Sequence, residues 1–231
     1  MSDELTLRPV GVYHCDFPLK FGLPRQSGLA PAIRGRIEFC GAFRNADYLR
    51  GIEGYSHLWL LWHFSEAGPV DSPTVRPPKL GGNTRVGVFA SRSPYRPNPI
   101  GLSCVKLDGV GKTKSGAPYL FVSGGDLADG TPVFDIKPYL AYADAHPEAS
   151  SGFAKTDGVL AVDFPSALLE QIPASHRDAL LQTLSLDPRP GYQDDPDRVY
   201  YLRCAALDVG FTVADDTLRV VAVRNADEAS G

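Results

Sequence analysis

Short apolar runs separated by clusters of glycine, proline, asparagine and aspartate fill the first 140 residues of the chain. Runs of this length predict β-strands, and their close spacing favours a barrel or a sandwich over alternating β-α units. The run at 56–64 is almost continuously apolar and aromatic, which predicts a strand buried on both faces. We expect strands at 5–13, 35–40, 56–64, 86–90, 102–107, 119–123 and 133–136, and a short helix at 45–49 capped by Asn45.

The pattern changes after Asp144. Residues 146–155 are small and polar, as in a linker, and apolar residues then recur at helical spacing within 166–186, with Ser175 as the expected N-cap. Further strands are expected at 199–207 and 218–223, the second after a turn at 214–217. The predicted fold class is mainly β with an α+β appendix, divided into domains at 1–160 and 161–231.

The 231-residue chain is 43% hydrophobic, which is enough to bury a full core. Its first eight residues are polar, unlike a secretory signal peptide. The longest apolar run is interrupted by His63 and is far too short to span a bilayer. We therefore expect a cytoplasmic protein with no membrane partner.

Metal and thiol chemistry has little support in the sequence. The four cysteines are scattered without a C-x-x-C pair, and no two histidines stand at metal-ligand spacing. Cys15 and Cys104 fall in strand-like runs, where a buried, inert thiol is the usual outcome. A P-loop and a G-x-G-x-x-G between strand and helix are also lacking. We expect no metal site, no disulfide framework and no phosphate-binding loop.

The net charge of −4 conceals an uneven distribution. Residues 1–106 carry a net charge of +5, residues 107–231 carry −9, and no acidic residue occurs between Ser72 and Leu107. An acidic chain is a poor general binder of nucleic acid, but its basic part can still present a positive face. The candidates for contact with an anionic partner are Arg76, Lys79, Arg85 and Arg96.

The segment RSPYRPNPIGLS at residues 92–103 is the most informative in the chain. Pro94, Pro97 and Pro99 stiffen its backbone and push the residues before them out of the helical region. Polar groups carried on a stiff segment lose less entropy when a ligand binds. The alternative is a proline-rich surface turn, but the density of arginine and amide groups favours a binding site that includes Arg92.

A second polar passage, GDLADGTPVFDIKP at residues 125–138, carries Asp126, Asp129, Asp135 and Lys137. Carboxylates near a basic segment can accept hydrogen bonds from ribose hydroxyls, balance a cation or act as a general base. Asp126 and Asp129 can equally form Asx turns. The local sequence leaves both interpretations open.

Five motifs in this order resemble those of the TrmO/YaeB family, which carries a TsaA-like domain and comprises tRNA N6-methyltransferases. Together they extend over nearly the whole chain, which makes the resemblance specific. The motifs are FGLPRQSG at 21–28, RPPKLGGN at 76–83, RSPYRPNPIGLS at 92–103, GDLADGTPVFDIKP at 125–138 and DPRPGY at 187–192.

The resemblance implies a single-sheet β-barrel domain that binds S-adenosylmethionine, followed by a small C-terminal domain, in a homodimer. It also implies methylation of N6 of threonylcarbamoyladenosine, next to the anticodon of threonine-type tRNAs. The acceptor nitrogen is a weak nucleophile with an acidic N–H, so a carboxylate that takes its proton would help, and Asp129 and Asp126 are the candidates. The basic face at 76–96 would hold phosphates of the RNA loop.

The family's cofactor contacts can be carried over only onto matching positions. The family often ends the strand after its F-S-H-L-W motif with a His-Gln pair, where this chain has Ser65 and Glu66. We include these two positions in the cofactor site and expect His63 in the core. The matching positions are Pro24, Arg25, Gln26, Arg92, Leu102, Asp126, Leu127, Ala128 and Asp129.

Two other functions are compatible with the same motifs. One is a non-catalytic regulatory module that binds S-adenosylmethionine or RNA, and the replacement at Ser65 and Glu66 is the one sequence feature that favours it. The other is a methyltransferase acting on a different acceptor, because a cofactor site does not fix the acceptor.

Overall fold

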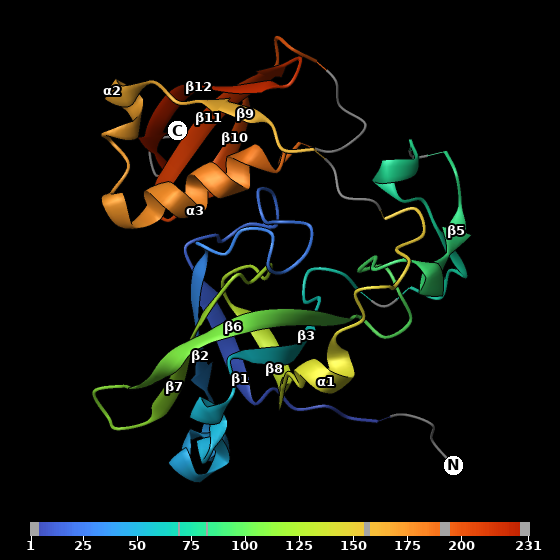
Figure 1. Cartoon of the computed structure of the whole chain (residues 1–231), viewed down its shortest axis with the longest axis vertical. Helices are drawn as coiled ribbons and strands as arrows, with labels where there is room; N and C mark the ends of the chain where they lie inside the picture. The colour runs from blue at the N-terminus through green and yellow to red at the C-terminus, as the bar shows by residue number, and fades with distance from the viewer. Residues whose placement is uncertain (1–4, 69, 82, 155–157, 190–194, 227–231) are drawn as a thin grey trace.

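A closed, antiparallel β-barrel forms the main body of the structure, a computed structural model that describes residues 5–68, 70–81, 83–154, 158–189 and 195–226 (Figure 1). The strand order around the barrel is β1-β2-β7-β6-β3-β8. The mainly β fold class with a barrel is therefore confirmed. The strands are β1 (Gly11–Cys15), β2 (Arg34–Phe39), β3 (His57–His63), β6 (Ile100–Lys112), β7 (Pro118–Ser123) and β8 (Thr131–Pro138).

The inner face of the barrel is closely packed with apolar side chains. Leu58, Leu60 and Trp62 of β3 point inward and are buried, whereas alternate residues such as Trp59 and Leu61 remain partly exposed. The prediction that 56–64 is buried on both faces is therefore wrong, because a strand in a closed barrel has one inner and one outer side. From the other strands the inner core takes Tyr13, Ile37, Phe39, Val105, Leu120, Val122 and Val133.

Several expected elements differ in length or type. β1 begins at Gly11, so the first half of the predicted strand at 5–13 is not in the barrel. The short helix predicted at 45–49 is a 3-10 helix at Ala46–Leu49, and the Asn45 side chain accepts a hydrogen bond from the Asp47 N–H, which confirms the cap. β6 continues to Lys112, well beyond the predicted end at 107.

The basic segment between β3 and β6 has little regular structure. The strand predicted at 86–90 is reduced to β5 (Val86–Gly87), which pairs with β4 (Thr74–Val75), and a 3-10 helix at Val88–Ala90 follows it. A one-turn helix that the sequence did not predict, α1 (Ala141–Asp144), follows β8.

The C-terminal part is a four-stranded sheet with α2 and α3 packed beside it (Figure 1). The predicted helix at 166–186 is broken in two by Pro173, which itself takes the N-cap position of α3, so Ser175 is not the cap. The elements are β9 (Ala161–Asp163), α2 (Ser166–Leu169), α3 (Ala174–Ser185), β10 (Tyr200–Cys204), β11 (Leu207–Ala214) and β12 (Thr217–Asn225).

The predicted strand at 199–207 is instead the first half of a hairpin. The chain reverses at Ala205, which has a φ of 50°, and β11 then pairs with β10. β11 was not predicted at all. The turn before β12 is confirmed, because Ala214 pairs with Thr217 across it.

Residues 16–33, between β1 and β2, belong to the C-terminal core as much as to the barrel. Phe17 and Ile33 lie in one buried cluster with Leu180, Leu202 and Phe211. Within the described part of the chain, none of the helices has the length and hydropathy that a bilayer crossing requires.

Polar contacts and close packing fasten the same segment. Asp16 pairs with His176 at 2.9 Å, and the Gln182 side chain accepts a hydrogen bond from the Ala32 N–H at 2.8 Å. A Cβ at Gly22, whose φ is 96°, would lie 2.6 Å from Leu202 Cδ1. The loop 16–33 belongs to the first predicted domain but fills part of the core of the second. The domain boundary at residue 160 therefore stays a prediction.

Candidate active site

The loops that carry three of the motifs, at 21–28, 92–103 and 125–138, meet at the end of the barrel that faces the C-terminal part (Figure 1). Gly28 donates its N–H to the Gly124 carbonyl at 2.8 Å, which joins the loop 16–33 to the loop after β7. Ser27 Oγ accepts a hydrogen bond from the Cys104 N–H of β6 at 3.0 Å. Three motifs far apart in the sequence therefore share one hydrogen-bonded framework.

Asp126 is anchored from inside the barrel. Ser103 Oγ donates to Asp126 Oδ1 at 2.5 Å and accepts a hydrogen bond from Trp62 Nε1 at 2.9 Å. Ser103 is only 1% exposed, so this relay is shielded from water. A shielded hydrogen bond of this kind fixes the carboxylate in one orientation.

Burial raises the pKa of Asp126 above its usual 3.8, because desolvation disfavours the charged carboxylate. The hydrogen bond from Ser103, the backbone N–H of Asp126 itself, the charge of Arg92 and the Ser27 N–H oppose this effect. The effect of burial on the pKa is larger than these opposing effects, so the Asp126 carboxyl group holds its proton more strongly than an exposed aspartate does.

Arg92 and Gln26 meet directly. Arg92 Nη1 donates to Gln26 Oε1, and Gln26 Nε2 donates to the Arg25 carbonyl at 2.5 Å. The proline-stiffened segment is thereby joined to the PRQ motif, and the guanidinium lies close enough to Asp126 to affect its pKa. The predicted residues Arg25, Gln26, Arg92 and Asp126 are thus brought together.

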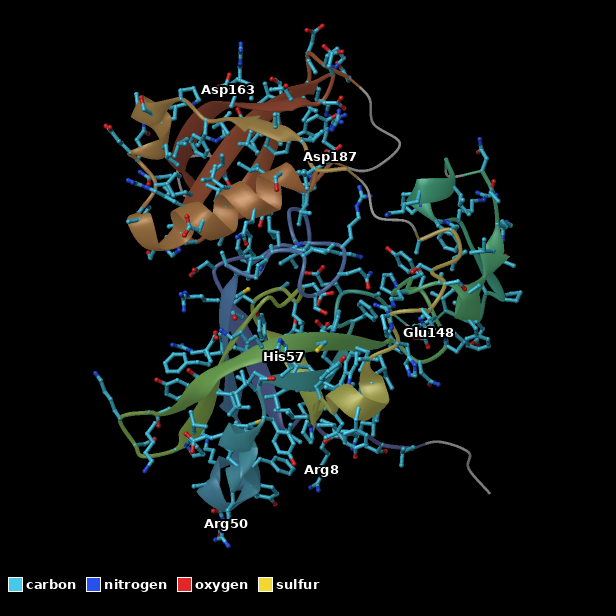
Figure 2. All side chains as sticks on the ribbon, viewed as in Figure 1. Arg8, Arg50, His57, Glu148, Asp163 and Asp187 are labelled. Carbon is cyan, nitrogen blue, oxygen red and sulfur yellow. The ribbon has the colours of Figure 1, made fainter. Side chains whose placement is uncertain are left out.

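The C-terminal DPRPGY motif approaches the same place. Arg25 Nη2 donates to the Arg189 carbonyl at 3.3 Å, and both oxygens of Asp187 accept hydrogen bonds from the Arg189 guanidinium at 2.9 Å. Asp187 lies just beyond the end of α3 (Figure 2). Positions 190–192 of the motif lie outside the described residues.

Asp129 occupies a different setting from Asp126. Its Oδ1 accepts a hydrogen bond from the Cys15 N–H at 3.1 Å and lies 3.0 Å from His14 Nδ1. The Asp129 side chain is 42% exposed, so solvent and a large ligand can reach it. The two candidate bases therefore lie on the inner and outer sides of one loop.

Leu127 and Ala128, between the two aspartates, have structural partners. The Leu127 side chain is buried in the barrel core, and the Ala128 carbonyl accepts a hydrogen bond from Thr131 Oγ1 at 2.7 Å. A ligand in this loop would therefore meet backbone atoms of Leu127 rather than its side chain.

Three predicted cofactor residues are not joined to this network. Leu102 is 52% exposed on the outer face of β6, opposite Leu61. Ser65 and Glu66 form an exposed turn after β3, and across the described residues no hydrogen bond or ion pair joins them to Asp126 or Arg92. The turn lies beside the proline segment, because the Phe64 N–H donates to the Pro99 carbonyl at 2.9 Å.

The predicted basic face is an arm beside the barrel, around β4 and β5 (Figure 1). Arg76, Lys79 and Arg85 are exposed on it, and Arg85 Nη1 donates to Thr74 Oγ1 at 2.6 Å. Arg96 Nη1 donates to the Ser91 carbonyl at 3.2 Å, so this side chain also braces its own loop.

Four site residues were not predicted: Trp62, Ser103, Ser27 and His14. Ser103 had a usable signal, because it is a polar residue at an inward position of a strand, where a polar side chain requires a partner. His14 had no such signal, because an outward histidine next to a strand end is common.

Cys15 and Cys104, which were expected to be buried, are only partly buried, whereas Cys204 is buried. Burial raises the pKa of Cys15 and of Cys204 to about 12 and also raises that of Cys104, so burial disfavours the thiolate at all three positions. Within the described segments, no three histidine, cysteine, aspartate or glutamate side chains gather where they could hold a metal ion.

A hollow of about 400 Å³ lies at the opposite end of the barrel. Leu49, Arg50 and Glu53 line it together with Val110 and Lys112 of β6. Figure 2 shows Arg50 at the end of the barrel farthest from the C-terminal sheet, so this hollow is remote from the motif loops.

Comparison with known protein families matches two consecutive domains. The tRNA-methyltransferase O N-terminal domain matches residues 12–145, and the TrmO C-terminal domain matches residues 158–226. Together they span most of the chain.

Curated relatives agree with this match. The chain is 37% identical over 225 residues to the tRNA (adenine(37)-N6)-methyltransferase of Escherichia coli K12, covering 93% of this chain and 95% of that protein. It is 44% identical over 172 residues to a protein of the same name from Eikenella corrodens, covering 73% and 97%. It is 41% identical to a putative S-adenosylmethionine-dependent methyltransferase, RcsF, of Pseudomonas aeruginosa, covering 96% and 99%.

The overall fold has solved counterparts. A crystal structure of TrmO from Pseudomonas aeruginosa superposes with a TM-score of 0.79 at 36% identity and covers 97% of this chain and 99% of that one. A second crystal structure of TrmO gives the same TM-score at 38% identity, covering 97% and 100%.

Proposed function

Because the chain belongs to the tRNA-methyltransferase O family, we propose that it methylates N6 of threonylcarbamoyladenosine next to the anticodon of threonine-type tRNAs. It is an S-adenosylmethionine-dependent methyltransferase by this membership. The proposed site rests on one observation: the side chains of Gln26, Arg92 and Asp126, from three separate motifs, lie close together.

The residues present fit the proposed cofactor. S-adenosylmethionine supplies an electrophilic methyl group on a positively charged sulfur. Its amino-acid end carries a carboxylate and an amino group, and its ribose carries two hydroxyls. Arg92 offers guanidinium donors and Asp126 offers a carboxylate acceptor, so the pair matches these groups in charge and hydrogen bonding.

The surrounding side chains hold these two groups ready for a ligand. Ser103 donates to Asp126, and Gln26 accepts from Arg92, so both charged groups are oriented before anything binds. Methyl transfer depends on an in-line arrangement of three atoms, and a pre-oriented site reduces the entropy that alignment costs. We place Pro24, Arg25, Gln26, Arg92 and the backbone of 126–129 in this binding role.

Asp129 is the better of the two candidate bases. It is exposed to an incoming RNA, and only one of its oxygens takes the hydrogen bonds from His14 and Cys15. Asp126 is partly buried and already accepts a hydrogen bond from Ser103. We therefore assign removal of the N6 proton to Asp129, with His14 orienting its carboxylate.

The basic arm supports a role in holding RNA. Its exposed side chains Arg76, Lys79 and Arg85, with Arg96 nearby, lie where no acidic residue interrupts the sequence. Loop phosphates bound there would let the target base leave its stack and enter the site.

Replacing Arg85 with alanine should weaken tRNA binding and reduce the slope of affinity against salt by about 1. An unchanged slope in a filter-binding titration would remove Arg85 from the RNA face.

We propose that the protein acts in the cytoplasm as a homodimer, and two exposed apolar residues support the dimer. Ile100 and Leu102 are 37% and 52% exposed on the outer face of β6, beside the turn that holds Ser65 and Glu66. A second copy packed on this apolar face would cover it and bring these residues to a shared cofactor site.

Transfer of labelled methyl groups from S-adenosylmethionine to tRNA, with and without prior threonylcarbamoylation, tests the function. We expect label only in the threonylcarbamoylated tRNA. Label in unmodified tRNA would point to a different acceptor. Cofactor binding by calorimetry without any label would leave the non-catalytic module as the function.

A further inference from the structure

The outer face of β2, β7 and β6 carries a row of aromatic and basic side chains that the proposed cofactor site does not use. Phe121 of β7 is 45% exposed and stands between Arg36 of β2 and Gly109 of β6. Tyr119, two residues earlier on the same face, packs edge-on against Phe121 at 4.8 Å between ring centroids. Tyr119 is half-buried and supports the exposed Phe121 ring, on which another planar ring can stack.

A bulge in β6 opens a hollow beside the Phe121 ring. The register of β6 against β7 shifts between Leu107 and Gly109, so Asp108 is the extra residue of the strand. Gly109 has no side chain to cover Phe121, and the space where a Cβ would lie is open. The hollow, about 300 Å³, is lined by Arg34, Gly35, Asp108, Phe121 and Val122. We call it the Phe121 hollow.

The charges around the Phe121 hollow suit a nucleotide. Arg34 lines one side, and Lys106 Nζ lies 3.4 Å from Asp108 Oδ1 on the other. Arg36 adds a third cation, although it also pairs with Glu38 at 2.9 Å. The Asp108 side chain is 22% exposed, so its carboxylate can still accept a hydrogen bond. Cations for phosphate, a ring for stacking and a carboxylate for an amino group are the groups that bind a single-stranded nucleotide.

The Phe121 hollow is also close to the proposed base. His14, which contacts Asp129, is directly opposite Arg36 in the pairing of β1 with β2, and Arg36 is directly opposite Phe121. At the usual strand spacing, this row of three places Phe121 about 10 Å from His14. One RNA strand could therefore contact both.

We propose that the Phe121 hollow is a nucleotide subsite for the substrate tRNA. A base with an exocyclic amino group stacks on Phe121 and donates to Asp108, while its phosphate meets Arg34. This assignment rests on the proposed function, because that function supplies the RNA. It adds a contact that positions the strand and takes no part in methyl transfer.

The test compares tRNA affinity of the full-length protein and its Phe121→Ala, Phe121→Leu and Phe121→Tyr variants by filter binding. We expect Phe121→Ala to weaken tRNA binding about five- to a hundred-fold, the range for loss of one base–aromatic stack. Phe121→Leu keeps apolar bulk but should remain weak, whereas Phe121→Tyr should bind as the wild type does. Tyr142→Ala, which removes an 88% exposed aromatic residue on α1, is the matched control.

Measurements of melting temperature and of S-adenosylmethionine affinity distinguish loss of the subsite from a folding defect or damage to the cofactor site. The Phe121 variants should melt within a few degrees of the wild type and bind S-adenosylmethionine with unchanged affinity, because the side chain is on the outer face. Ultraviolet cross-linking of the wild-type complex should join tRNA to the peptide that contains residues 118–123.

Three outcomes decide separately on the subsite and on the proposed function. Unchanged tRNA affinity in Phe121→Ala, while the wild type still methylates tRNA, rejects the subsite and leaves the proposed function intact. A change from dimer to monomer by light scattering, with unchanged tRNA affinity, would make this face a contact between copies. Loss of tRNA binding in Phe121→Ala when the wild type methylates no tRNA would support the subsite and reject the function.

Discussion

Two carboxylates only three residues apart, Asp126 and Asp129, occupy opposite sides of the loop between β7 and β8. On the inner side, Asp126 is bound by Ser103 and supported from the core by Trp62. On the outer side, Asp129 is open to solvent beside His14. The difference teaches that a short loop at the end of a barrel can hold two carboxylates in unlike surroundings, one facing the core and one facing solvent, as the two proposed roles require.

The strongest test of this division is Asp129→Asn. If Asp129 removes the N6 proton, methyl transfer should fall by about 10²- to 10⁴-fold while affinity for S-adenosylmethionine stays the same. Single-turnover kinetics and calorimetry measure the two quantities. Asp135→Asn is the matched control, since Asp135 lies in the same passage but pairs with Lys137 at 2.9 Å. Equal losses of methyl transfer in both variants would show that the reaction depends on the charge of this passage and not on Asp129 in particular.

On the inner side, Arg92→Ala should weaken binding of S-adenosylmethionine by roughly ten- to a hundred-fold, the value of a hydrogen bond to a charged group. The melting temperature without ligand should barely change, because Arg92 is exposed. Isothermal calorimetry and thermal denaturation separate the two effects. A large fall in melting temperature would instead make Arg92 a structural residue.

Ser103→Ala examines the anchor beneath Asp126. The change leaves Trp62 Nε1 without its acceptor and removes the side-chain donor to Asp126, which should cost about 1–3 kcal/mol in free energy of unfolding. Urea denaturation measures it, with Ser115→Ala in the exposed β6–β7 hairpin as the control. A cost no greater than that of the control would show that the relay adds no stability.

The raised pKa of Asp126 predicts a smaller, pH-dependent effect. The folded protein holds this proton more tightly than the unfolded chain, whose carboxyl has a pKa near 3.8. The stabilisation is therefore complete below pH 3.8 and is lost as the pH rises through the folded pKa, with a slope of at most about 1.4 kcal/mol per pH unit. In Asp126→Asn this component disappears. Parallel urea titrations from pH 3.5 to 7 would contradict the assignment if wild type and variant had the same slope.

The comparison also separates what the sequence could predict from what it could not. The short apolar runs predicted a barrel or a sandwich, and the resemblance chose the barrel; Gln26, Arg92 and Asp126 lie in motifs that the resemblance singled out. The partner of Ser103 could not be predicted in the same way, because it depends on which loop lies against the inner side of β6.

Two other features depended on contacts between distant parts of the chain. The bulge at Asp108 looks in sequence like the end of a strand, and only its pairing with β7 carries β6 onward to Lys112. The hairpin at Ala205 divides what appears as one apolar run, because that non-glycine residue takes a left-handed conformation that sequence rules assign mainly to glycine.

The loop 16–33 gives the protein a particular order of assembly. Its apolar side chains, Phe17 and Ile33 among them, find their packing partners in strands made from the last thirty or so residues of the chain. During synthesis the barrel strands leave the ribosome first, yet the loop that carries Arg25 and Gln26 lacks its support until translation is nearly complete. The loop of the proposed cofactor site is therefore expected to reach its final packing last, after the C-terminal strands have been made.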